Sequence, residues 1–243
     1  MVLKKILITG GSGRLGSYII PELEKINKFE IFYPNSKDLD ICDKDKVESV
    51  MSDINPDLVL HFAAYTDSKS AENIENEWIK CMDINTLGTI NILRYCSKNK
   101  KRLCYISTDA VFDGKEGNYS PSDLINPINK YARTKAAGEF CVRNYENSCI
   151  IRTAFFENNF PYEIAFEDQI TSKNYIDIIG PKILNICLNF EPSNIYHIGT
   201  EPISMYKLAK KRRPDVKKRK LIKFGNLKIA KNLSFSKIEK ERY

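Results

Sequence analysis

The 243-residue chain is poor in the side chains from which metal centres are usually built. Its two histidines, His61 and His197, exclude a histidine-rich metal site, and we expect each to stand at the end of a strand. Its seven cysteines are an odd number without a C-x-x-C pair, which favours buried free thiols over disulfides, metal ligands or a catalytic thiol. We therefore predict no metal centre.

Long apolar runs are also missing. No segment approaches the length of a membrane span, and the N-terminus enters a strand directly, so we expect a cytoplasmic protein with no membrane contact. The composition is 42% hydrophobic, which over 243 residues can bury a large core, as one domain or as one domain with a small lobe.

Positive charge is unevenly distributed along the chain. The net charge is +7, and many of the lysines and arginines lie at 210–220. We interpret this basic cluster as a solvated face, with attraction of a polyanionic small molecule as the alternative. Because no aromatic residues are interleaved with the cluster, nucleic acid is not an expected partner.

What the chain does contain is a glycine-rich turn near its start. The apolar run Ile6–Ile8 predicts a buried strand, four glycines follow at 10–16, and a helical apolar pattern occupies 15–23. Strand, glycine turn and helix predict a dinucleotide site, because the backbone can approach a pyrophosphate and the helix start offers free N–H groups. The residues predicted to bind the cofactor here are Gly10, Ser12, Gly13, Arg14, Leu15 and Gly16.

The second predicted strand, 29–33, lacks the acid that would bind the ribose hydroxyl of NAD. The loop that follows offers Asn35 and Ser36 as hydrogen-bond donors and Lys37 as a cation, with Arg14 as a second cation. This composition favours a 2′-phosphate, hence NADPH over NADH. An ordinary polar loop is the alternative.

Further cofactor contacts are predicted beyond this loop. Asp40 is placed to accept from the adenine amino group while the Ile41 amide donates, and Asp43 caps a helix at 44–52. A third strand lies within 56–64, and small residues at its end let a cofactor lie against the backbone. The predicted contacts there are Phe62, Ala63 and Ala64.

A long helix is predicted from about 70 to 98, with Asn85 near its middle. A buried asparagine needs partners, so Asn85 is either a core amide or part of an active-site water network.

The fourth strand, 102–107, is followed directly by Thr108. After a loop at 114–127, Pro127 opens a helix on which Tyr131 and Lys135 share one face, because they are four residues apart. Ligands bind at the carboxyl ends of parallel strands, so we expect the hydroxyl, the phenol and the ammonium to meet there.

The remaining pattern predicts an α/β fold, a doubly wound parallel sheet with a small, abbreviated C-terminal substrate lobe. Residues 1–153 form the dinucleotide-binding core, to which a strand near 193–199 returns, and 154–243 form the lobe. A helix is expected at 175–187. Beyond 214 we expect a small peripheral element, in which 232–237 lead into a last short helix.

Several stretches together resemble the extended short-chain dehydrogenases, and among them the dTDP-4-dehydrorhamnose reductase branch. The stretches are Thr9-Gly-Gly-Ser-Gly-Arg-Leu-Gly16, Asp38-Leu-Asp-Ile41, Ala63-Ala-Tyr-Thr66, Asn85-Thr-Leu-Gly-Thr89, Ser107-Thr-Asp-Ala-Val-Phe-Asp-Gly114, Tyr131 to Lys135, Ile151-Arg-Thr153, Asp168-Gln169 and Tyr196-His-Ile-Gly199. They occur in order over nearly the whole chain.

The resemblance implies an NADPH-dependent oxidoreductase that reduces the 4-keto group of a nucleotide-linked deoxysugar, in the biosynthesis of surface-polysaccharide sugars. Tyr131 would supply the proton that the new alkoxide needs, and Thr108 would hydrogen-bond the carbonyl oxygen. Lys135 would lower the pKa of the tyrosine and hold the nicotinamide ribose. By resemblance, Asn85 would order a water path to the lysine.

The chain departs from this family on the substrate side. Ala110 stands where the family usually has a large residue, and the segment 156–169 is much shorter. Aromatic residues at 162, 166 and 175 either stack on a nucleotide base or form a small core. We expect a nucleotide diphosphate beside this segment, helped by the basic cluster, and a homodimer that covers the open site. The predicted substrate residues are Thr66, Asp109, Gln169, Ser172 and Tyr175.

Two other functions stay open on the same scaffold. An epimerase or dehydratase is one, although a dehydratase usually has a glutamate after the acid, and Asp109 is followed by Ala110. A non-catalytic, cofactor-binding subunit is the other, as in the regulatory subunit of methionine adenosyltransferase. Fold alone does not decide among them.

Overall fold

The computed structural model describes residues 4–221, 230–236 and 239–243. Its main sheet has seven strands in the order β14-β10-β5-β4-β3-β1-β2, and all neighbours are parallel except β10 and β14. These strands are β1 (Lys4–Thr9), β2 (Phe29–Phe32), β3 (Leu58–His61), β4 (Arg102–Thr108), β5 (Ser148–Thr153), β10 (Asn194–Ile198) and β14 (Lys240–Arg242).

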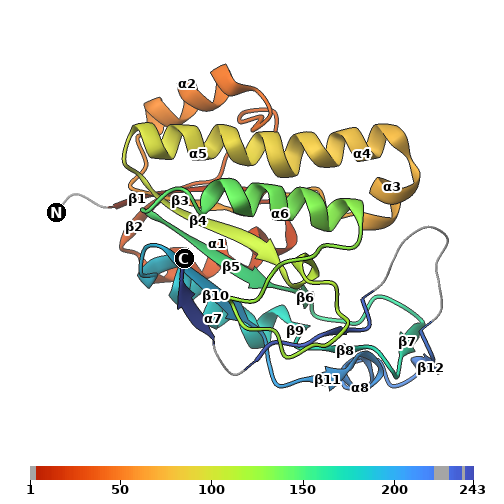
Figure 1. Ribbon diagram of the computed structural model, residues 1–243. Helices are drawn as coiled ribbons and strands as arrows, with labels where there is room; N and C mark the ends of the chain where they lie inside the picture. Colours follow the sequence, from red (N-terminus) through yellow and green to blue (C-terminus); the bar gives the residue numbers. More distant parts are fainter. Residues whose placement is uncertain (1–3, 222–229, 237–238) are drawn as a thin grey trace.

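Helices cover both faces of this sheet (Figure 1). One face packs against α1 (Arg14–Ile26) and α7 (Ile176–Asn189), and the other against α2 (Lys44–Ile54), α5 (Thr89–Lys98) and α6 (Lys130–Val142). Alternate strand residues enter opposite layers, as Ile6 and Ile8 face α1 whereas Leu7 faces α2. Burial on both faces is why the strands read as continuous apolar runs.

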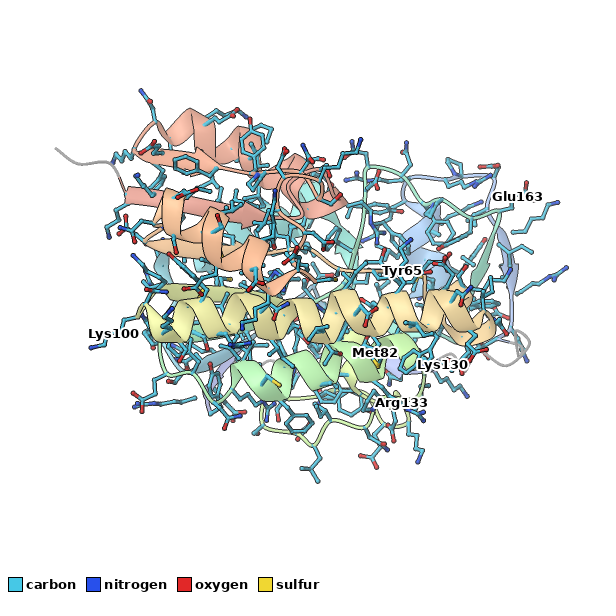
Figure 2. The ribbon with its side chains drawn as sticks, turned by 90° about the horizontal axis from the view of Figure 1, so that it is seen from above. Tyr65, Met82, Lys100, Lys130, Arg133 and Glu163 are labelled. Carbon is cyan, nitrogen blue, oxygen red and sulfur yellow. The ribbon has the colours of Figure 1, made fainter. Side chains whose placement is uncertain are left out.

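The predicted long helix is interrupted twice. Ile74 is extended (φ −122°, ψ 121°) and separates α3 (Ser68–Asn73) from α4 (Glu75–Met82). A π-helical turn, Asp83–Gly88, then joins α4 to α5, and it contains Asn85. The three helical pieces still follow one another alongside α6 (Figure 2). For this reason the apolar pattern of the sequence is that of one continuous helix.

Two helix starts test the capping predictions. Asp43 is the N-cap of α2, where its side chain accepts from the amides of Asp45 and Lys46, as predicted. Pro127, by contrast, does not open the next helix. Asn129 is the N-cap of α6, and its side chain accepts from the Ala132 amide at 2.9 Å.

A small lobe lies at the carboxyl ends of the strands (Figure 1). It encloses a separate apolar cluster that includes Phe156, Phe160 and Tyr175. Its elements are β6 (Phe155–Phe156), β7 (Ile164–Phe166), β8 (Ile170–Thr171), β9 (Asn174–Tyr175), β11 (Ile203–Ser204), α8 (Met205–Lys210), β12 (Lys217–Arg219) and β13 (Asn232–Leu233).

The C-terminal segment departs from expectation. The last described residues form β14, which pairs antiparallel with β10, and not a short helix. The boundary at 153 stays a prediction, but α7 and β14 lie beyond it and pack with the main sheet. In the described parts of the chain, no helix is long and apolar enough to cross a membrane.

Candidate active site

The glycine turn is built for close backbone approach. Gly10 has φ +70°, and a Cβ there would lie 2.6 Å from the Ala63 nitrogen, so the loop can cross the end of β3 only with glycine at this position. Gly13 is the N-cap of α1 and supplies no side-chain cap. The first N–H groups of α1 therefore remain for a ligand, and a dinucleotide pyrophosphate fits this arrangement.

A cleft opens between this turn, the carboxyl ends of the strands and the lobe. It brings together three of the four predicted catalytic residues, Thr108, Tyr131 and Lys135. Predicted cofactor and substrate residues that also line it are Gly10, Ser12, Gly13, Arg14, Leu15, Phe62, Ala64, Thr66, Asp109 and Gln169.

Thr108 ends β4 and is held by its own neighbours. Its hydroxyl donates to Asp109 Oδ1 at 3.1 Å and accepts from the Ala110 amide at 3.1 Å. Asp109 is buried, and burial raises the pKa of its carboxyl while the charge of Lys173 lowers it. The hydroxyl is thus oriented by an acid that lies beside it in the cleft.

Lys135 lies almost fully buried one helical turn beyond Tyr131. Its ammonium is 4.2 Å from the centroid of the Tyr105 ring. Burial lowers the pKa of Lys135 to about 7, although the charge of Glu139 raises it. The protein therefore holds a lysine that can change charge near neutral pH.

The tyrosine does not behave as expected. Burial and the charge of Asp109 raise the pKa of Tyr131 to about 12, whereas a hydrogen bond from Thr108 and the charge of Arg14 lower it. The net shift of the Tyr131 pKa is therefore upward in the protein without ligands, because desolvation outweighs the opposing contributions. That Lys135 lowers this pKa stays a prediction.

Asn85 is a core amide. Its Oδ1 accepts from the Tyr65 amide at 2.8 Å, and its Nδ2 donates to the Tyr65 carbonyl at 3.0 Å and to Thr134 Oγ1 at 3.0 Å. The side chain is fully buried and does not line the cleft. Asn85 thus positions the chain beyond β3 from within the core, and its part in a water network stays a prediction.

The predicted 2′-phosphate loop lies outside the cleft lining. Asn35 organises it, because its Oδ1 accepts from the Lys37 amide at 2.8 Å. Arg14 lines the cleft instead, where its charge acts on Tyr131 and Lys173. That Lys37 binds a 2′-phosphate stays a prediction. Arg14, predicted as the second cation there, lies in the lining of the cleft, which does not include Lys37.

The adenine-side residues also lie outside that lining. Asp40 is exposed, and its Oδ1 accepts from the Cys42 amide at 2.9 Å. Ile41 is buried, and its carbonyl accepts from Asn91 at 2.9 Å. Contact of these two residues with adenine stays a prediction.

Comparison with known proteins identifies the family. The RmlD substrate binding domain family matches residues 4–180. The chain belongs to this family. It is 28% identical over 230 residues to dTDP-4-dehydrorhamnose reductase of Aggregatibacter actinomycetemcomitans, covering 85% of this chain and 77% of that protein. It is 33% identical over 158 residues to the protein of that name from Mycobacterium tuberculosis, covering 63% of this chain and 50% of that protein.

A solved structure extends the likeness to the fold. The crystal structure of Bacillus anthracis dTDP-4-dehydrorhamnose reductase in complex with NADP matches with a TM-score of 0.83 at 27% identity, covering 97% of this chain and 91% of that chain. The predicted fold class and the predicted family are both confirmed.

Two predicted substrate residues of this RmlD-family chain are structural. Tyr175 is 1% exposed in the lobe core, where its hydroxyl donates to the Leu208 carbonyl at 3.2 Å. Ser172 is also buried, and its Oγ accepts from the Phe235 amide at 3.0 Å. Neither side chain lines the cleft, so their contact with substrate stays a prediction that this geometry does not support. Tyr162, 61% exposed, does line the cleft.

The basic cluster at 210–220 forms a solvated face. Arg212 pairs with Asp177 at 2.6 Å and Lys218 with Glu167 at 3.3 Å. None of its described side chains lines the cleft. The alternative that it attracts a polyanion into the site has no support in this geometry.

Two groups near the cleft received no role in the sequence analysis. Lys173 lines the cleft from the turn between β8 and β9, and no motif spacing marks it. Behind the cleft, Glu139 and Arg152 form a fully buried ion pair at 2.6 Å. Glu139 lies four residues beyond Lys135, which was the available signal.

Proposed function

We propose that this chain is a reductase that uses NADPH to reduce the 4-keto group of a nucleotide-linked deoxysugar. The observation that carries the proposal is the meeting of Thr108, Tyr131 and Lys135 in one cleft with the glycine turn. The names of the relatives, dTDP-4-dehydrorhamnose reductases, support the substrate class. The NADP in the Bacillus anthracis crystal structure supports the cofactor.

The residues fit the chemistry of carbonyl reduction. NADPH, when bound, supplies a hydride to the carbonyl carbon. Thr108 would donate a hydrogen bond to the carbonyl oxygen once its hydroxyl turns from Asp109, and Tyr131 would deliver the proton. Lys135 would hold ribose hydroxyls, and its ammonium would stabilise the phenolate that remains after Tyr131 has delivered its proton.

Replacement of Tyr131 by phenylalanine tests the reductase. Turnover of NADPH with a panel of 4-keto nucleotide sugars, followed by NADPH absorbance, should fall by about 10²- to 10⁴-fold, the usual contribution of a positioned acid. NADPH binding should persist, because only a hydroxyl is lost. Tyr206→Phe, in the lobe and outside the cleft lining, is the matched control.

The outcome also separates the alternatives. A wild-type protein that binds NADPH but turns over none of the panel would favour the non-catalytic subunit. Product with inverted configuration but no net NADPH oxidation would favour an epimerase.

Replacement of Lys37 by glutamate tests the cofactor preference. In the loop after β2, the acid next to Lys37 is Asp38. The Asp38 carboxylate already accepts a hydrogen bond from the Asn35 side chain. NADPH should bind wild type more tightly than NADH, and the variant should lose that preference, because repulsion replaces attraction at the 2′-phosphate. Calorimetric titration measures both affinities, with Lys28→Glu as an exposed control. Equal affinities in the wild type would contradict the assignment.

We also propose a homodimer in the cytoplasm. Ile79, Met82 and Leu87 are exposed apolar side chains on α4 and the π-helical turn. Figure 2 looks onto these helices and shows Met82 on the side of α4 that faces α6. Such side chains suit a homodimer. The seven cysteines are free thiols, which suits the reducing cytoplasm.

A further inference from the structure

The walls of the cleft carry an excess of positive charge. Arg14, Lys135 and Lys173 line it, against the single acid Asp109. In the described parts of the chain, neither Arg14 nor Lys173 forms an ion pair within 4 Å. Lys135 has Glu139 behind it on the same helix, and the charge of Asp109 acts on Lys173 although the two do not form an ion pair. Two cations are therefore left for a ligand.

Lys173 is fixed on the lobe side of the cleft. Its backbone amide donates to Thr171 Oγ1 at 2.9 Å, which holds the turn between β8 and β9. Its ammonium lies 4.5 Å from the centroid of the Phe156 ring. The aromatic ring partly compensates the ammonium for its lost hydration. The N–H groups of the ammonium stay free for an acceptor.

Arg14 lines the same cleft as the first residue of α1, directly after the glycine turn. Its charge lowers the pKa of Lys173, so the two cations repel each other within the cleft. Asp109 attracts Lys173 but is engaged by the Thr108 hydroxyl at 3.1 Å. The repulsion between two like charges that line one cleft is reduced when an anion binds near both of them.

We propose that Arg14 and Lys173 together bind one phosphate group, which bridges the glycine turn and the lobe. A guanidinium can hold two phosphate oxygens with a fork of N–H groups, and an ammonium supplies a point charge from the lobe. The phosphate comes from the nucleotide diphosphate of the substrate or from the cofactor pyrophosphate. That the phosphate belongs to the substrate or to the cofactor rests on the proposed function. The phosphate site itself rests on the two cations.

Calorimetric titration of Lys173→Met tests the site. The ligands are NADPH alone, and dTDP in the presence of saturating NADPH, both at low salt. Loss of one charge-assisted hydrogen bond should weaken binding of the bridged ligand about 10- to 100-fold. Weaker dTDP binding with unchanged NADPH binding assigns the phosphate to the substrate, and the reverse assigns it to the cofactor. A Lys173→Met protein that binds both ligands like the wild type overturns the proposal.

Further variants keep the result specific. Lys173→Arg should retain most of the affinity, and Lys211→Met, an exposed lysine outside the cleft lining, should retain all of it. Arg14→Met should weaken the same ligand, and the double variant should lose less than the sum of the two losses, because both cations hold one phosphate. Additive losses on different ligands would contradict a shared phosphate. Since binding is read without turnover, a failed reductase assay leaves this test intact.

Discussion

At the scale of single residues, the predictable side chains are those tied to a strand end or to a helical repeat. Thr108 follows an apolar strand, and Tyr131 and Lys135 are one helical turn apart, so sequence spacing placed them in one cleft. Ser172 and Tyr175 lie among very short strands, where no periodicity shows which side chain faces inward. Their burial depends on contacts with residues 208 and 235, far along the chain.

The buried charge of Lys135 should cost stability. Its pKa is lowered from 10.5 to about 7, so between these values the unfolded chain binds more protons than the folded protein. The contribution of Lys135 to the free energy of unfolding therefore rises as pH increases from about 7 towards 10.5. Below about pH 7 the destabilisation by Lys135 reaches its full size. The side chain to which the proposed function gives a role is thus one whose charged form destabilises the fold.

Lys135→Met should accordingly raise the melting temperature of the ligand-free protein at pH 6. The advantage over wild type should shrink as pH rises through 8 and 9, which thermal unfolding at several pH values would show. Lys130→Met, on the same helix but partly exposed, is the control and should change little. An advantage that stays constant with pH would mean that packing of the methionine, and not charge, is the cause.

At the scale of elements, the sequence predicted which segments are helices and strands better than how they are joined. The pattern of α3, α4 and α5 is one helical stripe, and a π-helical turn adds a residue without changing the residue types. The turn depends on Asn85, whose bonds to Tyr65 and Thr134 come from other elements. Such bonds are not visible in a local pattern.

One buried ion pair ties α6 to the sheet. Glu139 of α6 accepts from Arg152 of β5 at 2.6 Å and from Ser107 of β4 at 2.7 Å. The charge of Arg152 and the hydrogen bonds outweigh burial and lower the pKa of Glu139. The contribution of Glu139 is therefore present above its ordinary pKa of 4.5 and is lost as pH falls through its lower folded value.

Glu139→Gln should destabilise the protein by about 3–5 kcal/mol at neutral pH, because it leaves the Arg152 charge buried and unpaired. Urea unfolding would measure the loss. Glu48→Gln removes the exposed partner of Lys98 and should cost less than about 1 kcal/mol. If both variants lose the same small amount, solvent reaches the pair and the burial argument is wrong.

At the scale of the whole molecule, the end of the described chain completes the sheet. β14 carries the charged sequence Lys-Glu-Arg, which gives no apolar alternation, so the sequence could not predict a strand there. Pairing with β10 is decided by the neighbouring backbone. The His197 amide donates to the Glu239 carbonyl at 2.8 Å, and the Tyr243 amide to the Ser193 carbonyl at 2.9 Å.

Removal of residues 239–243 should therefore weaken the fold while sparing the cleft. Among the interactions that the truncation removes are these two bonds, the 2.6 Å hydrogen bond between the Tyr243 and Ser148 hydroxyls, and the pairing of β14 with β10. At about 1 kcal/mol for each hydrogen bond, the three named bonds alone correspond to about 3 kcal/mol, so stability should fall by at least that amount. For a chain of this size, the melting temperature should fall by about 2–4 °C for each kcal/mol.

Exposure of the β10 edge should add a second effect, because an unpaired strand edge promotes association between chains. Light scattering during heating would detect it, and NADPH binding at low temperature should be preserved, since the cleft is lined by other elements. Tyr243→Phe removes only the hydroxyl and should lower stability by about 1 kcal/mol without association. A truncated protein that melts like the wild type and stays dispersed would show that β14 covers the edge without stabilising the sheet.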